Sequence, residues 1–142
     1  METLLENMIT YEVGIKLVIA ATLSLVIGIE RELKKKPVGL KTSLVIATFS
    51  CLLTIISIET AYSTPPARED INITMDPLRL AAQIVSGIGF LGAGVILRRG
   101  NDSITGLTTA AMIWGAAGIG IAVGGGILHG CNISGCDHCF WN

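Results

Sequence analysis

The sequence predicts an all-α protein, a polytopic bundle of four membrane-spanning helices rich in glycine and alanine. Hydrophobic residues make up 51% of the 142 residues, only 15% are charged, and the charged residues cluster between long uncharged runs. A soluble domain normally has about a quarter of its residues charged, so this chain has too few to cover a soluble surface. A helical bundle in water is the alternative, but the polar faces with a period of 3.6 residues that it requires are missing.

The uncharged runs place the four helices along the chain. The runs 17–29, 43–58, 80–97 and 103–128 contain no charged residue. A bilayer core of about 30 Å needs about 20 mostly apolar helical residues. Extended by their flanks, the runs predict spans over about 13–30, 42–61, 78–97 and 105–128. The first span includes Lys16, whose ammonium we expect to reach outward to water.

Helix starts and membrane orientation follow from the residues between the runs. Asp76 and Pro77 are expected to begin the third helix, and Asp102 with Ser103 is the candidate cap of the fourth. The acidic N-terminus lacks the positive region of a cleavable signal, so the first helix should remain in the membrane. Seven of the ten Lys and Arg residues lie in the first and third connections. This bias predicts that these connections are cytoplasmic and that the N-terminus is periplasmic.

Small residues are frequent in the third and fourth predicted helices. The packing candidates are Gly87, Gly89, Gly92, Gly94, Ala116, Gly120 and Gly124. Small residues let helix backbones approach closely in a membrane, so tight packing within the chain or between protomers is the simpler interpretation. The alternative is a bent or broken helix whose freed carbonyls face a polar cavity, as in transporters.

Few polar residues lie within the predicted spans. The functional candidates are Glu30, Arg31, Asp76, Arg79, Gln83 and Ser86. Glu30 and Arg31 close the first span, and the simplest interpretation is that both reach water at the interface. Arg79, Gln83 and Ser86 share a stripe at helical spacing, and we expect it to lie inside the bundle. Hydrogen bonding between helices and a polar cavity or ion path both remain open for this stripe.

Three long blocks of the sequence carry a family resemblance. They are GIERELKKKPVGLKT (28–42), DPLRLAAQIVSGIGFLGAGVIL (76–97) and GLTTAAMIWGAAGIGIAVGGG (106–126). In this order they resemble the signature blocks of the MgtC/SapB family of bacterial inner-membrane proteins, and the resemblance covers about 13–126. It implies a small helical membrane protein linked to growth in low magnesium, virulence and survival inside host cells. In some members it also implies restraint of the F-type ATP synthase. Transport of magnesium is an older suggestion for this family.

The end of the chain departs from this resemblance. Family members usually continue into a fifth apolar helix, whereas this sequence ends in ILHGCNISGCDHCFWN. We therefore expect a transmembrane domain over 1–128 that lacks the fifth helix. We expect 129–142 to be a disordered tail from a truncated or frame-shifted reading. The tail holds five possible soft ligands, but a functionless tail is favoured over a disulfide, and a disulfide over a metal site.

The sequence contains no arrangement typical of a catalytic site. Its only histidines are His129 and His138, so no Ser–His dyad can form within the spans, and no phosphate-binding glycine motif follows a strand. We therefore predict a protein that is not an enzyme and has no cofactor and no bound metal. The expected partners are membrane lipid, the F-type ATP synthase or another membrane complex, and a second copy in a homodimer, but not nucleic acid. A regulatory membrane protein is the main hypothesis, and a small oligomeric channel or transporter for Mg²⁺ or another cation is the alternative.

Overall fold

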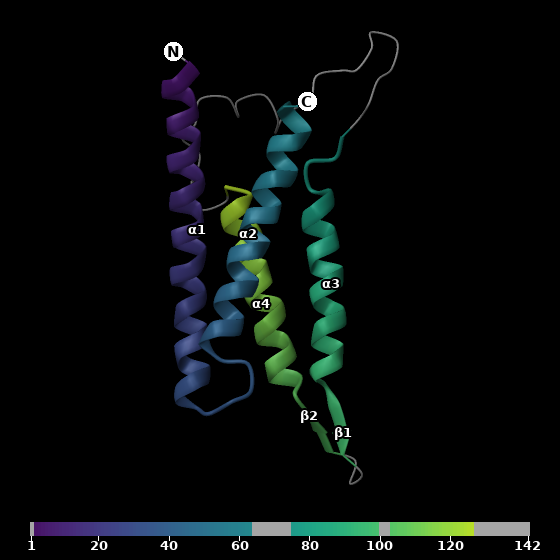
Figure 1. Cartoon of the computed structure of the whole chain (residues 1–142). Helices are drawn as coiled ribbons and strands as arrows, with labels where there is room; N and C mark the ends of the chain where they lie inside the picture. The colour runs from purple at the N-terminus through teal and green to yellow at the C-terminus, as the bar shows by residue number, and fades with distance from the viewer. Residues whose placement is uncertain (1, 64–74, 100–102, 127–142) are drawn as a thin grey trace, which may run out of the picture.

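The structure, a computed structural model, describes residues 2–63, 75–99 and 103–126 and confirms the all-α helical bundle. Four helices and one short hairpin make up this described part of the chain (Figure 1). In order they are α1 (Glu2–Leu33), α2 (Leu40–Ser63), α3 (Arg79–Val95), β1 (Leu97–Arg99), β2 (Ser103–Thr105) and α4 (Leu107–Gly124).

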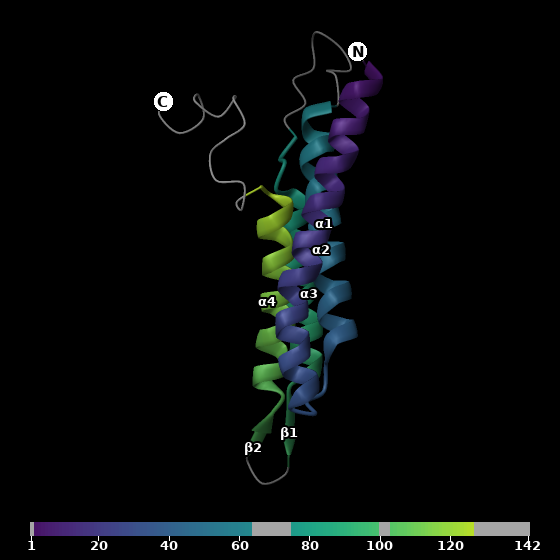
Figure 2. The same ribbon diagram turned by 90° about the vertical axis from the view of Figure 1, so that its left-hand side faces the viewer.

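The helices α2 and α4 form the centre of the bundle. Figure 1 shows α1 and α3 on opposite sides, with α2 and α4 between them. The connection from α1 to α2 and the β1–β2 hairpin lie at the same end, and the N-terminal end of α1 lies at the other (Figures 1 and 2). The first and third connections therefore lie together, as the predicted orientation requires.

Three of the described helices are long and apolar enough to cross a membrane. By length and composition the candidate spans are Tyr11–Leu33, Leu40–Tyr62 and Leu107–Gly124. The helix α3 has 17 residues and is shorter than the predicted span over 78–97. It ends early because the chain becomes extended at Ile96 and continues into β1. In contrast, α1 begins well before position 13, since residues 2–12 contain neither glycine nor proline to break a helix.

The hairpin replaces the predicted cap of the fourth helix. Leu97 pairs with Thr105 in an antiparallel register, and Ser103 lies in β2 opposite Arg99. The prediction that Ser103 caps α4 is therefore wrong, and Asp102 lies outside the described residues. Gly106 is the N-cap residue of the helix, with a φ of 94°, and it has no side chain that could cap the first turn. An added Cβ there would collide with the Val95 carbonyl, so only glycine fits this turn.

Asp76 bonds to the turn before α3, but it does not begin the helix as the sequence predicted. Its Oδ1 accepts a hydrogen bond from the Leu78 backbone N–H at 2.9 Å, and its carbonyl accepts one from the Arg79 N–H at 3.3 Å. The regular helix begins at Arg79 rather than at Pro77, with Leu78 at the N-cap. Asp76 thus stabilises the turn that precedes the helix rather than the helix end itself.

The closest packing in the bundle is between α2 and α4. A Cβ added to Gly120 would collide with the Ala47 carbonyl and lie 2.9 Å from the Cys51 nitrogen. At Gly124 it would lie 2.7 Å from the Cys51 carbonyl oxygen. Cys51 itself is fully buried as a free thiol. The two backbones therefore touch along this contact, which small residues permit.

Hydroxyl groups line the buried side of α2. The buried members are Ser43, Ser50, Thr54 and Ser57. The Ser43 and Thr54 hydroxyls donate to carbonyls four residues earlier, at 3.3 Å and 2.8 Å, while the Ser57 hydroxyl accepts from the Leu80 N–H at 3.4 Å. The hydroxyls of Ser43 and Thr54 thus satisfy their own donors with a carbonyl one turn earlier. The sequence reading did not identify this set of residues.

Candidate functional site at the α1–α2 connection

Among the residues whose burial the structure describes, the buried cation is Arg31, in the last turn of α1. Only 6% of its surface is exposed, whereas the adjacent Glu30 is exposed. The interpretation that both side chains reach water at the interface is therefore wrong for Arg31. The helical turn separates the two residues, because successive side chains point about 100° apart. Glu30 points out of the bundle and Arg31 points into it.

Arg31 joins three parts of the chain. Its Nη2 donates to the Thr109 Oγ1 at 2.6 Å and to the Pro37 carbonyl at 3.1 Å. Thr109 is itself buried and lies in the first turn of α4. One guanidinium therefore connects the end of α1, the following connection and the beginning of α4. The sequence reading missed Thr109, because a hydroxyl at the start of an apolar helix does not by itself indicate a partner.

The positive charge of Arg31 has no carboxylate partner among the described residues. The ion pairs found there are Lys16 with Glu12 at 2.7 Å and Lys34 with Glu30 at 2.6 Å. The Arg31 Nε–H is buried and has no hydrogen-bond partner in the same part of the chain. A buried charge is costly unless it is paired and hydrogen-bonded. Arg31 is thus an incompletely satisfied cation.

The connection beside Arg31 has a strained backbone. Lys35 and Val38 have φ values of 48° and 63°. A β-branched residue such as valine is rarely found in this left-handed region. The turn is also tight, because a Cβ added to Gly28 on α1 would lie 2.7 Å from the Leu40 Cα on α2. The Pro37 carbonyl that accepts from Arg31 lies within this constrained turn.

Basic side chains surround this end of the bundle. Lys34, Lys35, Lys36 and Lys41 are all exposed, and they lie in the same connection or at the start of α2. Lys34 bonds to Glu30, one turn earlier on α1. The surface near Arg31 is therefore basic and is expected to attract anions.

The second set of predicted site residues lies on α3 and faces outward. In the part of the chain that the structure describes, Arg79, Gln83 and Ser86 are exposed. The prediction that these three side chains lie inside the bundle is therefore wrong for a single chain. The buried residues of α3 are Ala81 and Gly92. At 100° per residue the polar stripe falls on the opposite side of the helix from these two. The structure therefore does not bring this stripe together with Arg31.

Gln83 does border a groove between α2 and α3. The groove has a volume of about 440 Å³ and is lined mainly by apolar side chains, among them Phe49, Leu53, Leu80 and Ile84. Gly87 also lines it. The groove exists because α3 packs mainly on α4. At that contact, a Cβ added to Gly92 would lie 3.5 Å from the Cβ of Ala110. Gln83 is thus a single amide beside an apolar hollow.

The predicted packing glycines divide into two groups. On α4, Ala116, Gly120 and Gly124 are buried. On α3, a Cβ added to Gly87, Gly89 or Gly94 would meet nothing within 4 Å. Within the described chain, Gly92, Gly120 and Gly124 therefore serve helix contacts, while the other glycines of α3 leave an open surface.

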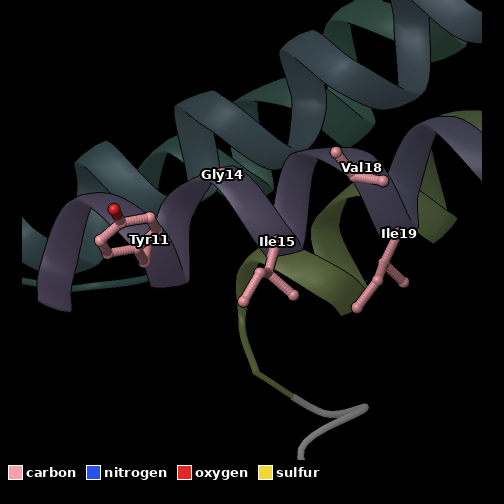
Figure 3. A pocket seen from close by; sticks show the side chains of 5 residues that line it. All are labelled: Tyr11, Gly14, Ile15, Val18 and Ile19. Carbon is pink, nitrogen blue, oxygen red and sulfur yellow. The ribbon is translucent and has the colours of Figure 1, made fainter.

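A second hollow lies along α1 near its N-terminal half. Figure 3 shows Ile15 and Ile19 projecting on the same side of the helix, with Tyr11 further along. The hollow has a volume of about 370 Å³ and is also lined by Gly14 and Val18. Its lining is almost wholly apolar, as expected for a surface that faces acyl chains. It offers little chemistry for a specific site.

The metal candidates of the sequence cannot be placed. His129, Cys131, Cys136, His138 and Cys139 lie outside the described residues. Over 2–63, 75–99 and 103–126, no group of three or more His, Cys, Asp or Glu side chains could hold a metal ion. The site that this part of the chain offers is thus the buried Arg31 with its surrounding basic residues.

Comparisons with known proteins identify the family. Residues 17–134 match the model of the MgtC family. The chain is 62% identical to "Protein SapB" of Bacillus subtilis over 81% of its length and 48% of that protein. It is 43% identical to "Putative magnesium transporter YhiD" of Escherichia coli K12, over 83% of its length and 53% of that protein. It is 40% identical to "Protein MgtC" of Salmonella typhimurium, over 84% of its length and 46% of that protein.

The chain spans about half the length of these relatives. No solved structure matches it. The apolar helices and the family match agree that this is a membrane protein. Since the matching segment covers most of the sequence and includes all three blocks that carried the resemblance, the chain belongs to the MgtC family.

Proposed function

We propose that this chain is a regulatory protein of the bacterial inner membrane that supports adaptation to low magnesium and, in a host, intracellular survival. It acts by helix contacts with a membrane complex, for which the F-type ATP synthase is the leading candidate. The link to magnesium is supported by membership of the MgtC family together with the name of the Escherichia coli relative, a putative magnesium transporter. Catalysis, a cofactor and a bound metal are not part of the proposal.

The observation that carries the proposal is the outward polar stripe of α3. Arg79, Gln83 and Ser86 are exposed on a helix that is otherwise apolar. A polar side chain that faces acyl chains is costly, so such residues usually face protein or water. The rest of the described bundle does not cover them. A partner helix that supplies hydrogen-bonding groups would satisfy this stripe, and that is the contact expected of a regulator.

The proposed orientation places the first and third connections in the cytoplasm. The basic residues of these connections, at one end of the bundle, support it. The N-terminus would then be periplasmic. In this orientation Arg31 and its surrounding lysines lie at the cytoplasmic surface.

Transport of Mg²⁺ or another cation is the second candidate. The name of the Escherichia coli relative refers to magnesium transport. Against a path through a single chain, the α2 and α4 backbones touch at Gly120 and Gly124, which leaves no lumen between the central helices. Transport would therefore require several protomers, with the groove beside Gln83 as part of the path.

The test compares Gln83→Leu with Val85→Leu, a change between apolar residues at an exposed position on the same helix. Bacteria that depend on this protein would be grown in low magnesium, with protein levels measured in the membrane fraction. We expect Gln83→Leu to reach normal levels but to fail to support growth, while Val85→Leu behaves as wild type. Normal growth of both variants would contradict a functional role for the stripe.

A flux assay separates regulation from transport. Wild-type protein in liposomes would be assayed for Mg²⁺ uptake, and ATP hydrolysis by the synthase would be measured in membrane vesicles with and without the protein. Regulation predicts no Mg²⁺ flux above protein-free liposomes and lowered ATP hydrolysis that Gln83→Leu restores. Mg²⁺ flux lost in Gln83→Leu would instead favour the transporter.

A further inference from the structure

We propose that Arg31 and the first turn of α4 form a binding site for a phosphate group. The phosphate belongs either to the headgroup of an anionic phospholipid or to free inorganic phosphate. The proposal rests on the buried, incompletely satisfied guanidinium and is independent of the proposed regulatory role.

The first argument is the shortage of acceptors around Arg31. A guanidinium carries five N–H donors. In the described chain only Nη2 donates, to Thr109 and to Pro37, and the buried Nε–H has no partner. The residue is 6% exposed and its Nε is buried, so bulk water does not satisfy that N–H. A phosphate offers several acceptor oxygens and would satisfy donors that the protein leaves unused.

The second argument is the shortage of negative charge. Glu30 is the residue next to Arg31, but its side chain is exposed and forms an ion pair with Lys34. No carboxylate of the described segments pairs with Arg31. A buried charge without a counter-ion is strongly unfavourable, so the native environment is expected to supply one. A bound anion would be this counter-ion.

The third argument is the position of Arg31 at the beginning of α4. The 2.6 Å hydrogen bond to Thr109 places the guanidinium at the first turn of this 18-residue helix. The first N–H groups of a helix have no partner within it, and the N-cap residue of α4, Gly106, has no side chain to cap them. The helix dipole places partial positive charge at the same end. A cation beside this end is unfavourable alone, whereas an anion that contacts both the guanidinium and the helix end is stabilised by both.

The depth of the site in the membrane also fits a phosphate. The candidate span of α1 ends at Leu33 and that of α4 begins at Leu107. Arg31 and Thr109 thus lie within about one helical turn of the span ends, where the phosphates of phospholipids are found. The exposed Lys35, Lys36 and Lys41 would raise the local concentration of anions at this surface. Pro37, the longer contact of Arg31, is exposed and marks the side from which an anion would enter.

The experiment measures anion binding by the full chain purified in an uncharged detergent. Thermal unfolding would be followed while phosphatidylglycerol, phosphatidylcholine or inorganic phosphate is added, at constant ionic strength. Native mass spectrometry would count the phospholipids that remain bound. The variants are Arg31→Gln, Arg31→Lys and the matched control Lys36→Gln, which removes an exposed charge from the same connection.

We expect phosphatidylglycerol to raise the unfolding temperature of wild type. Lys36→Gln should reach the same rise at a higher lipid concentration, because it lacks one charge that attracts anions, and phosphatidylcholine should have little effect. Arg31→Gln should lose this rise, and Arg31→Lys should bind about tenfold more weakly because an ammonium has fewer fixed donors. A rise caused by inorganic phosphate but not by the lipid would assign the site to the free anion.

Two results would overturn the proposal. An equal rise in wild type and Arg31→Gln would show that surface lysines bind the anion without Arg31. If Arg31→Gln does not fold, the measurements on the wild-type protein decide. An unfolding temperature that rises with neither anion, together with no retained phosphatidylglycerol, would show that no phosphate site exists.

Discussion

Arg31 in the last turn of α1 donates from Nη2 to the Oγ1 of Thr109 in the first turn of α4, at 2.6 Å, across 78 positions of sequence. Both residues are buried. The bond joins a charged donor to a neutral acceptor, and such charge-assisted bonds are stronger than bonds between neutral groups. It fixes the end of the first helix to the beginning of the fourth, where the β1–β2 hairpin also enters the bundle.

Thr109→Val tests the contribution of this bond to stability. Valine keeps the shape of threonine but removes the acceptor, so the Arg31 N–H loses a partner in a buried place. We expect a loss of about 1 to 3 kcal/mol in the free energy of unfolding, measured by chemical denaturation in detergent. Thr108→Val is the matched control, since Thr108 is the exposed neighbour on the same turn. Equal effects of the two substitutions would show that the bond contributes nothing.

Val38→Gly tests the strain in the α1–α2 connection. Glycine adopts the φ of 63° found at Val38 without steric cost. The relief is about 1 to 2 kcal/mol and is partly offset by the greater chain entropy of glycine in the unfolded state. We therefore expect unchanged or raised stability, by up to about 1 kcal/mol.

The control for this prediction is Val45→Gly, at an exposed position within α2. There the helical backbone favours valine over glycine, and a loss of stability is expected. A similar loss in both variants would show that Val38 is not held in the left-handed region. Circular dichroism would verify that both variants keep their helices.

The helical fold could be predicted from the sequence because its signals are local. Uncharged runs of sufficient length predicted all four helices, and α2 at Leu40–Ser63 lies close to the expected 42–61. Which face of each helix packs against the rest of the bundle was harder to predict. Arg79, Gln83 and Ser86 share a stripe, as their spacing predicts, but the packing of α3 on α4 turns this stripe outward. The spacing of residues shows which of them share a face of a helix, but it does not show which face a neighbouring helix covers.

The candidate site was predicted only in part for the same reason. The basic cluster from Lys34 to Lys41 is visible in the sequence, as is Arg31 itself. Arg31 is buried beside its partner Thr109, which is distant in sequence and reaches the site only through the arrangement of α1, α2 and α4. The β1–β2 hairpin was missed because three-residue strands are too short to show a period.

The proposed orientation can be tested by cysteine labelling. After replacement of the native cysteines, a single cysteine would be placed at Lys35 or at Met75, which are both exposed in the structure. An impermeant thiol reagent applied to intact cells should label position 75 and leave position 35 unlabelled until the cells are opened. The reverse pattern would invert the orientation, and labelling at both positions in intact cells would change the number of spans.

Gly120→Leu tests the close contact between α2 and α4. A Cβ at position 120 would already collide with the Ala47 carbonyl and lie 2.8 Å from the Ser50 Cβ, so leucine forces the helices apart. Overpacking of this kind costs about 1 to 3 kcal/mol, and more where backbone must move, so we expect a lower unfolding temperature or loss of folded protein. Gly118→Leu is the matched control on the same helix, because a Cβ there would meet nothing within 4 Å. Both variants replace a glycine of α4 by leucine and therefore change the helix propensity equally. A difference between their unfolding temperatures then reports the contact with α2 alone. If both variants unfold at the same temperature as wild type, α4 does not pack on α2 through Gly120, and the central contact of the bundle would have to lie elsewhere.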